Sequence, residues 1–273
     1  MWSCPFPAVM DCACSVSPGP EPAVSGGGSI ALSLAHGIAH LVLRREDGRN
    51  AISPALLDEL EAAVAAVAEA PHVKVLVLRG EGKVFSVGVD LAALEALPPP
   101  EALDFFRRGQ ALIRRLDRLN ALTVAAINGL ALGGGFELAL ACDLRWAHAR
   151  AVLGFPECKR GLIPAWGGIR LLHRHLACEQ VLALVTSGEF LGVRAAYTVG
   201  LVSRIFAGRD FAEQVSTAVE AFRARDATDL RALKAGPRES ADAWREWHTA
   251  EAAAFEALWL RRTGAREPGS SKL

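Results

Sequence analysis

Three glycines followed by a glutamate form the stretch of this sequence with the clearest chemical potential, Gly133-Gly134-Gly135-Phe136-Glu137. An apolar run from Thr123 to Ile127 leads into the glycines, and a run typical of a helix follows them, so we expect a strand, a glycine turn and a helix start. Glycine lets the backbone approach a ligand closely, and the first N–H groups of a helix have no partner inside it. Such groups can stabilise an oxygen that carries negative charge, with Glu137 about one turn away. The alternative interpretation is a tight turn followed by a surface acid.

Other chemistries have weaker support in the sequence. The glycine stretch fits neither the dinucleotide-binding pattern nor the P-loop pattern, so phosphate binding is not predicted. Ser86 has no G-x-S-x-G context and no visible base partner. His173 and His175 are two residues apart on a predicted helix and face different directions, which disfavours a metal pair. Cys158 is interpreted as a packed thiol.

Length and composition place the chain among globular proteins. Its 273 residues suit one large domain, or a domain with an appendage, and half of them are hydrophobic. The formal net charge of zero gives no global reason to expect binding to nucleic acid or to an anionic membrane. No apolar run approaches the roughly 18 residues that span a bilayer. None of the six cysteines has zinc-finger spacing, and reduced thiols in an intracellular protein are predicted.

Hydrophobic periodicity predicts the elements that must position these residues. We expect a β-hairpin over 29–44 and a helix from Pro54 to about Ala70 capped by Ser53. A strand over 73–78, a mobile loop over 92–100 and a helix over 101–119 follow. The remaining predictions are a strand over 144–147, a helix over 168–176 and helices through 211–262. The helix over 101–119 carries five arginines, which are Arg107, Arg108, Arg114, Arg115 and Arg118. Their expected role is a solvated or subunit-facing stripe.

Two further stretches accompany the glycines. One runs from Lys83 to Leu91, and the other from Gly154 to Gly168, which contains Pro156-Glu157. Together and in this order, the three stretches resemble the enoyl-CoA hydratase/isomerase family, also called the crotonase family, from about Ile30 to about Phe206. The sequence departs from the family pattern at two places: Glu46 replaces a proline after Arg45, and Ile169-Arg170-Leu171 stands where Thr-Gln-Arg is usual.

The resemblance implies a fold and a division of the chain. The expected fold is α/β, a ClpP-like crotonase spiral of ββα units with a helical C-terminal region. Residues 1–28 are expected to be a disordered leader, 29–206 the spiral core, and 207–273 the helical region with a frayed tail. Trimers, often paired into hexamers, are the assembly that the resemblance implies.

The resemblance also implies a site for an acyl-CoA thioester. The N–H groups of Val89 and Gly134 would form an oxyanion hole, and valine is acceptable at position 89 because its backbone does this work. Glu157 would give a proton to the α-carbon, while Glu137 would hold and deprotonate a water molecule. The neighbouring Val87, Asp90 and Leu91 are expected to bind the substrate. No metal and no separate cofactor are expected, because CoA enters as part of the substrate.

Several functions stay open at this point. The leading one is hydration of a trans-2-enoyl-CoA in fatty acid metabolism, and the second is isomerisation of a 3-enoyl-CoA with Glu157 alone. Decarboxylation and biosynthetic dehydration are other reactions of the family. A non-catalytic protein that binds RNA or protein through the arginine-rich helix is the alternative of another class, with nucleic acid the less expected partner. The final Ser271-Lys272-Leu273 matches a peroxisomal address if the source is a eukaryote, whereas a bacterial source would imply the cytoplasm.

Overall fold

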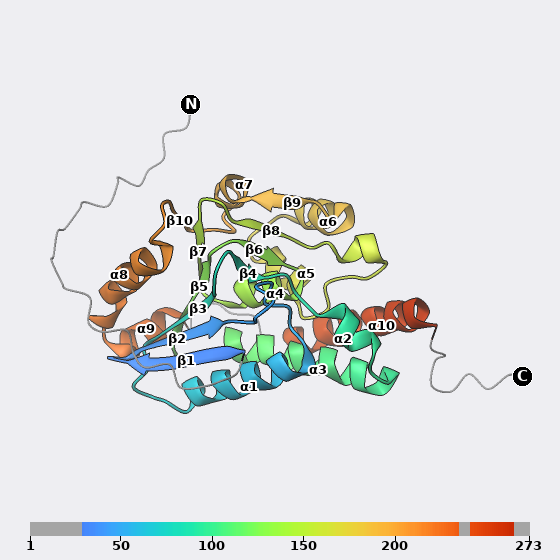
Figure 1. Cartoon of the computed structure of the whole chain (residues 1–273), viewed down its shortest axis with the longest axis horizontal. Coiled ribbons are helices and arrows are strands. Elements are labelled where there is room, and N and C mark those ends of the chain that lie inside the picture. The colour runs from blue at the N-terminus through green and yellow to red at the C-terminus, as the bar shows by residue number, and fades with distance from the viewer. Residues whose placement is uncertain (1–28, 235–240, 265–273) are drawn as a thin grey trace, which may run out of the picture.

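The computed structural model describes residues 29–234 and 241–264 (Figure 1). The strands are β1 (Ile30–Ala35), β2 (Ile38–Leu43), β3 (Val75–Gly80), β4 (Val84–Ser86), β5 (Leu122–Ile127), β6 (Leu130–Leu132), β7 (Leu144–His148), β8 (Val152–Gly154), β9 (Phe190–Gly192) and β10 (Arg204–Phe206). The helices are α1 (Pro54–Ala68), α2 (Leu91–Glu95), α3 (Pro99–Asp117), α4 (Gly134–Ala141), the 3₁₀ turn η1 (Glu157–Arg160), α5 (Gly168–His173), α6 (Cys178–Ser187), α7 (Val193–Thr198), α8 (Phe211–Arg223), α9 (Ala227–Lys234) and α10 (Ala241–Thr263).

The strands form two sheets that the chain visits in turn. The larger sheet has the order β1-β2-β3-β5-β7-β10, and the smaller one has the order β4-β6-β8-β9. In the pairs β3–β4, β5–β6 and β7–β8, the first strand therefore lies in the larger sheet and the second in the smaller one, and a helix or 3₁₀ turn follows each pair (Figure 1). The pairing is parallel except for the hairpin β1–β2 and the pair β8–β9. This repetition builds a spiral of ββα units.

Both faces of the larger sheet are buried, which explains the nearly continuous apolar runs of its parallel strands. In β3, Leu76 and Leu78 belong to the main core, whereas Val75 and Val77 belong to a second core. That second core is closed by the apolar face of α8. The side chains of a strand alternate between its two faces, so one strand supplies both cores. The result is a rigid frame beneath the turns that follow β3 and β5.

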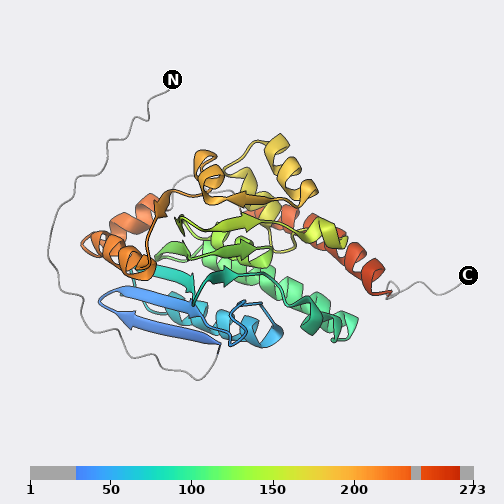
Figure 2. The same ribbon diagram turned by 45° about the horizontal axis from the view of Figure 1, so that its top comes forward.

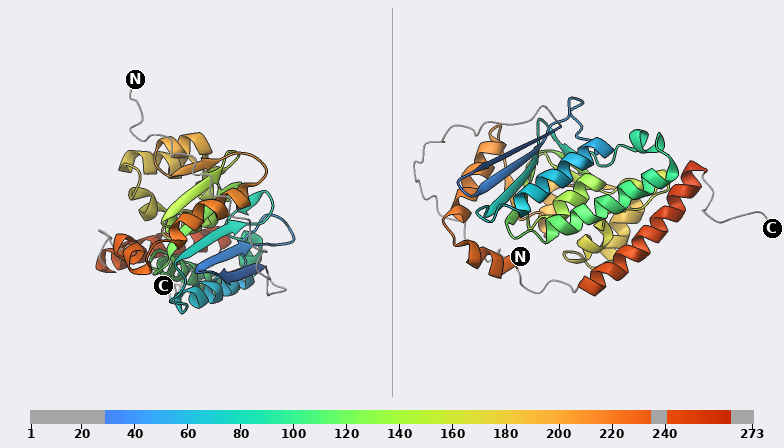
Figure 3. Two further views of the ribbon diagram at one scale, coloured as in Figure 1. Left: turned by 90° about the vertical axis from the view of Figure 1, so that its left-hand side faces the viewer. Right: turned by 90° about the horizontal axis from the view of Figure 1, so that it is seen from below.

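Helices α1, α3 and α10 lie side by side over one face of the molecule, as the right-hand view of Figure 3 shows. The layers of strands lie behind them, and the turned view of Figure 2 separates the two sheets from these helices. Aromatic rings join α3 to α10, because the ring centroids of Phe106 and Phe255 are 3.9 Å apart. The C-terminal helix is thus packed onto the core.

Most of the expected elements are confirmed, including the hairpin that turns at residues 36–37 and the helix α1 capped by Ser53, whose hydroxyl accepts from the Leu56 N–H at 3.3 Å. The mobile loop predicted over 92–100 is wrong. Residues 91–95 form α2 instead, because the Asp90 carboxylate caps the helix and Leu94 is buried in the core. Helix α3 begins at Pro99, since proline suits the first position of a helix.

Parts of the predicted organisation lie outside the described residues. These are the leader over 1–28, the final tail with Ser271-Lys272-Leu273, and three of the six cysteines. Within the described ranges, the last strand ends at Phe206 and only helices follow it. The three-part division of the chain stays a prediction.

Candidate active site

The loop after β4 approaches the start of α4, which brings Val89 close to Gly134. Gly134 is the first residue of α4, so its N–H has no intrahelical partner. Gly88 packs against this turn, and a Cβ at position 88 would lie 3.1 Å from the nitrogen of Gly134 and 2.7 Å from the carbonyl oxygen of Leu132. Within the described residues, neither the Gly134 N–H nor the Val89 N–H donates a hydrogen bond. The structure therefore brings together Val89 and Gly134, whose N–H groups the sequence predicts to form an oxyanion hole.

The loop that carries Val89 is held by a buried polar frame. The Ser86 hydroxyl donates to the carbonyl oxygen of Asn50 at 2.8 Å and accepts from the N–H of Gly88 at 3.1 Å. The Asn50 amide donates to the carbonyl oxygens of Val84 and Phe85 at 2.9 and 3.2 Å. Asn50 has a φ of 50°, a strained backbone that this set of hydrogen bonds stabilises. Ser86 is a scaffold for the loop, consistent with the absence of a base partner.

Glu137 lies one turn into α4, and its side chain is only 2% exposed. Its Oε1 accepts two backbone hydrogen bonds, from the N–H of Trp166 and from the N–H of Gly168, both at 2.8 Å. These donors lie at the start of α5 and just before it, so hydrogen bonds to this carboxylate connect α5 to α4. Two N–H donors favour the charged form of a carboxyl group.

Glu157 begins the turn η1, and its carboxyl reaches back over the glycine turn. Gly133 has φ 51° and ψ −129°, and a Cβ at this position would lie 2.6 Å from Oε1 of Glu157. Only glycine fits there, because it tolerates the backbone angles and leaves room for the carboxyl. The other oxygen, Oε2, is buried and has no hydrogen-bond partner among the described residues. Burial raises the pKa of Glu157 to about 7, against weaker opposition from its own backbone N–H and from Arg160.

A third carboxyl, that of Glu251 on α10, adds to the electrostatics of this region. Burial raises the pKa of Glu251 to about 8, and the Gly167 N–H and Arg170 oppose this shift only weakly. The pKa of Glu137 is raised well above its ordinary range, first by burial and then by the charges of Glu251 and Glu157. Like charges within one buried cluster oppose one another, so the three carboxyls are not all ionised at neutral pH.

The residues predicted to bind substrate next to Val89 have structural contacts of their own. The Asp90 carboxylate accepts from the Ala93 N–H at 3.2 Å and pairs with Arg45 at 3.1 Å. Arg45 also donates to the carbonyl oxygen of Ala51 at 2.6 Å, so this pair ties the loop to the segment before α1. Val87 and Leu91 are partly exposed beside it. Their contact with a substrate stays a prediction.

The remaining candidates have ordinary structural surroundings. Arg108 of the arginine-rich helix α3 forms ion pairs with Asp58 and Glu61 of α1, and Arg107 lies 3.8 Å from Glu256 of α10. His175 contacts the guanidinium of Arg145 at 3.3 Å. Over residues 29–234 and 241–264, no group of three or more His, Cys, Asp or Glu side chains is placed to hold a metal ion, and no helix has both the length and the apolar character to cross a membrane.

Comparisons with known proteins identify the family of this chain. A family model described as enoyl-CoA hydratase/isomerase matches residues 33–261. The chain belongs to this family. Its fold is the crotonase spiral, since the crystal structure of an enoyl-CoA hydratase from Bacillus anthracis aligns with a TM-score of 0.74 at 26% identity, over 83% of this chain and 90% of that one. The predicted fold class is therefore confirmed.

Individual relatives have names that point to more than one reaction. The crotonyl-CoA hydratase of Syntrophomonas wolfei subsp. wolfei is 32% identical over 203 residues, which cover 74% of this chain and 78% of that protein. The enoyl-CoA isomerase/hydratase of Mycosarcoma maydis is 36% identical over 181 residues. That match covers 63% of this chain and 66% of the relative, so the chain spans slightly less than two thirds of its length.

Four residues contribute to the site in ways that were not predicted from the sequence. The N–H groups of Trp166 and Gly168 hold Glu137, but backbone donors leave no residue-type signal. Glu251 lies far along the chain in a helix with no motif. Asn50 offered the one usable signal, because a buried asparagine before a helix often shapes a turn through its side chain.

Proposed function

We propose that the protein hydrates trans-2-enoyl-CoA thioesters to 3-hydroxyacyl-CoA thioesters. The water oxygen attacks C3 while the Glu137 carboxylate takes one water proton, and the double-bond electrons move onto the thioester oxygen. The N–H groups of Val89 and Gly134 donate to this enolate oxygen. The carboxylic acid of Glu157 then gives its proton to C2, which completes the addition of one water. A proton passes from Glu137 to Glu157 before the next turnover.

The observation that supports this proposal best is the state of Glu157. Its Oε2 is buried and unpartnered among the described residues, it lies against the turn that supplies Gly134, and its pKa is raised to about 7. A carboxyl in such surroundings holds a proton near neutral pH and can release it to a carbon that becomes basic.

The division of roles between the carboxyls follows from their hydrogen bonds. Below about pH 7, Glu157 and Glu251 both hold protons, which removes the two charges that oppose ionisation of Glu137. The two backbone N–H groups on Oε1 then favour negative charge on Glu137 over its neighbours. We therefore assign the base to Glu137 and the acid to Glu157.

A second candidate is the shift of a double bond from C3 to C2, with Glu157 moving the proton. The specific observation in its favour is that Oε2 of Glu157 is buried without a hydrogen-bond partner among the described residues, while Oε1 of Glu137 already accepts two backbone hydrogen bonds. The relative from Mycosarcoma maydis is named for both isomerase and hydratase activity.

Loss of the absorbance of the conjugated thioester in crotonyl-CoA tests the proposal directly. Purified protein should produce 3-hydroxybutyryl-CoA, identified by mass. Glu137→Gln should lower this rate by orders of magnitude but reduce isomerisation of 3-hexenoyl-CoA much less. Glu95→Gln is a matched control, because that carboxyl lies on α2 and pairs with Arg262 at the surface. Undiminished hydration by Glu137→Gln would exclude the role given to this residue.

Other properties of the family accompany this proposal. We expect a homotrimer or hexamer, which light scattering after gel filtration measures. We also expect activity without an added metal or cofactor, with CoA bound as part of the substrate. The peroxisomal or cytoplasmic location stays a prediction, since residues 271–273 lie outside the described part of the chain.

A further inference from the structure

The indole of Trp166 lies against the candidate oxyanion hole. Trp166 precedes α5 and is fully buried. A Cβ at Gly134 would lie 3.3 Å from Cζ3 and 3.4 Å from Cε3 of this indole, and 3.3 Å from Cγ2 of Val89. The side chains of Trp166 and Val89 therefore meet beside the residue whose N–H would hold the thioester oxygen. An acyl group bound there would have the indole as a wall.

Helix α3 is shaped to receive the other edge of the indole. A Cβ at Gly109 would lie 2.0 Å from Cε2 and 2.1 Å from Nε1 of Trp166, so only glycine fits opposite the ring. Glycine weakens the interior of a helix, and α3 accepts one at this point of close approach. The ring of Phe105 also contacts the indole, with centroids 5.6 Å apart. The indole thus fills the space between α4 and α3 from one helix to the other.

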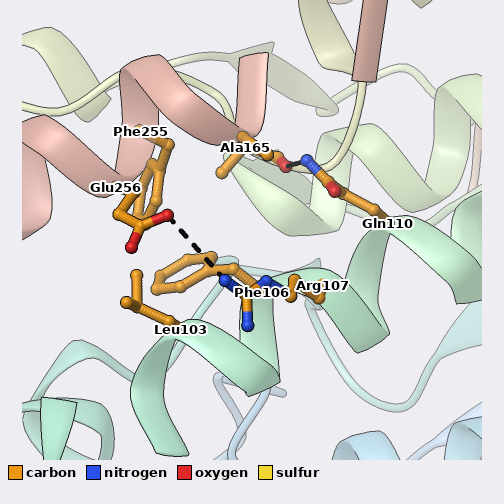
Figure 4. Close-up of a pocket in the computed structure, with 8 residues that line it drawn as sticks. Leu103, Phe106, Arg107, Gln110, Ala165, Phe255 and Glu256 are labelled. Atoms are coloured by element: carbon orange, nitrogen blue, oxygen red, sulfur yellow. Dashed lines mark hydrogen bonds and ion pairs between the residues drawn. The ribbon is translucent and has the colours of Figure 1, made fainter. Parts of the chain in front are cut away.

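A small pocket lies on the other side of the same segment (Figure 4). Ala165 lines it together with Leu103 and Phe106 of α3 and Phe255 of α10. The Gln110 amide of α3 donates to the carbonyl oxygen of Ala165 at 2.8 Å, which fixes this wall. The pocket is apolar at its base, with the Arg107–Glu256 pair at its rim. The segment Ala165–Trp166 thus contacts this pocket through Ala165 and the candidate oxyanion hole through the indole.

We propose that Trp166 determines acyl-chain length by closing the acyl end of the site, so that the protein accepts short acyl groups. This inference rests on the proposed function, because it needs a thioester oxygen at the N–H groups of Val89 and Gly134. The indole N–H lies on the α3 side, next to Gly109, so the ring presents carbon atoms to the acyl group. Replacing the indole with a smaller side chain would extend the site towards α3 and the pocket beside Ala165.

Binding of saturated acyl-CoAs tests this inference separately from catalysis. We would measure the Kd of butyryl-, hexanoyl-, octanoyl- and decanoyl-CoA by calorimetry for the wild type, Trp166→Ala and Trp166→Phe. The wild type should bind butyryl-CoA best and decanoyl-CoA at least about tenfold more weakly, since pocket size discriminates single methylenes by roughly tenfold or more. Trp166→Ala should bind decanoyl-CoA more tightly than the wild type by a similar factor. The Kd of Trp166→Phe for decanoyl-CoA should lie between those of the wild type and Trp166→Ala.

Trp146→Ala is the matched control, because Trp146 is a buried tryptophan in the second core, on β7 beneath α8. It should lower stability without changing the chain-length profile. If Trp166→Ala does not fold, the change in the chain-length profile of Trp166→Phe tests the inference instead. A wild type that prefers decanoyl-CoA, or variants with the wild-type profile, would overturn the inference even if crotonyl-CoA is hydrated. Absence of binding to every acyl-CoA would instead count against the proposed function.

Discussion

The carboxyl of Glu157 is the single group on which the proposed chemistry depends most. Its Oε2 is buried without a partner among the described residues, so it is free to act on a substrate. We expect Glu157→Gln to lower the kcat for crotonyl-CoA hydration by about 10²–10⁴-fold, the usual worth of a positioned general acid. The amide has nearly the same shape and needs no charge, so the melting temperature should stay close to that of the wild type. Calorimetric binding of butyryl-CoA should also persist.

The same carboxyl sets an expectation for the pH dependence of the rate. Glu157 must hold its proton to give it to C2, and its pKa is raised to about 7. Hydration should therefore decline as the pH rises through about 7, and the decline should appear in kcat/KM, which reports groups of the free enzyme. Steady-state rates from pH 5.5 to 9 measure this. A rate that climbs steadily to pH 9 would contradict the role of Glu157 as an acid.

At the scale of elements, the loop between β4 and α2 positions Val89 through hydrogen bonds of Ser86. The hydroxyl joins the carbonyl oxygen of Asn50 to the N–H of Gly88, one residue before the predicted oxyanion donor. We expect Ser86→Ala to lower kcat about tenfold or more with little change in KM. The substitution leaves the buried partners of the hydroxyl without a hydrogen bond, which costs about 1–3 kcal/mol and loosens the position of Val89. The effect is on the transition state, where the N–H direction matters most.

Ser187 at the end of α6 offers a matched control. Its hydroxyl also donates to a carbonyl oxygen, that of Leu184, and accepts from an N–H two residues later, that of Glu189. Ser187→Ala should cost some stability and leave kcat unchanged. Equal losses of kcat in the two variants would mean that Ser86 acts on overall stability and not on the oxyanion hole.

How far the sequence predicted these elements depended on whether the deciding interaction was local. Ser53-Pro54 predicted the start of α1, because capping uses neighbouring residues. Residues 91–95 were predicted as loop, because α2 depends on the burial of Leu94 against residues distant in the sequence. In the site, glycine and glutamate motifs predicted Gly134, Glu137 and Glu157, whereas the backbone donors of Trp166 and Gly168 have no signature in residue type.

At the scale of the whole molecule, the C-terminal helix connects the last residues to the site. Phe255 and Trp259 of α10 stack with ring centroids 6.0 Å apart, and both rings contact Phe106 of α3. The same helix carries Glu251 at the back of the carboxyl cluster, near Arg170 of α5 and Glu137 of α4. Stability and active-site charge are therefore coupled through one helix, and α10 completes a site whose motifs lie about 100 residues earlier.

This coupling predicts how the free energy of unfolding depends on pH. The pKa of Glu251 rises from an ordinary 4.5 to about 8 in the folded protein. Between these values the folded state binds more protons than the unfolded state, so stability falls as the pH rises, by roughly 1.4 kcal/mol per pH unit at most from this group. The contribution is fully present below pH 4.5 and is lost as the pH passes through about 8.

Urea unfolding of the wild type and Glu251→Gln from pH 5 to 8 measures this contribution. Glutamine cannot ionise. The free energy of unfolding of the wild type should therefore fall by up to a few kcal/mol relative to that of the variant as the pH rises over this range. His248 lies 3.9 Å from Glu251 and has a pKa lowered to about 4, which makes both proteins less stable below pH 6.5 and largely cancels in the difference. Glu256→Gln on the same helix should follow the wild type, because Glu256 shows no comparable burial and pairs with Arg107 near the surface. Parallel curves for the wild type and Glu251→Gln would show that Glu251 is ionised in the folded protein, and the base assigned to Glu137 would then lose its electrostatic support.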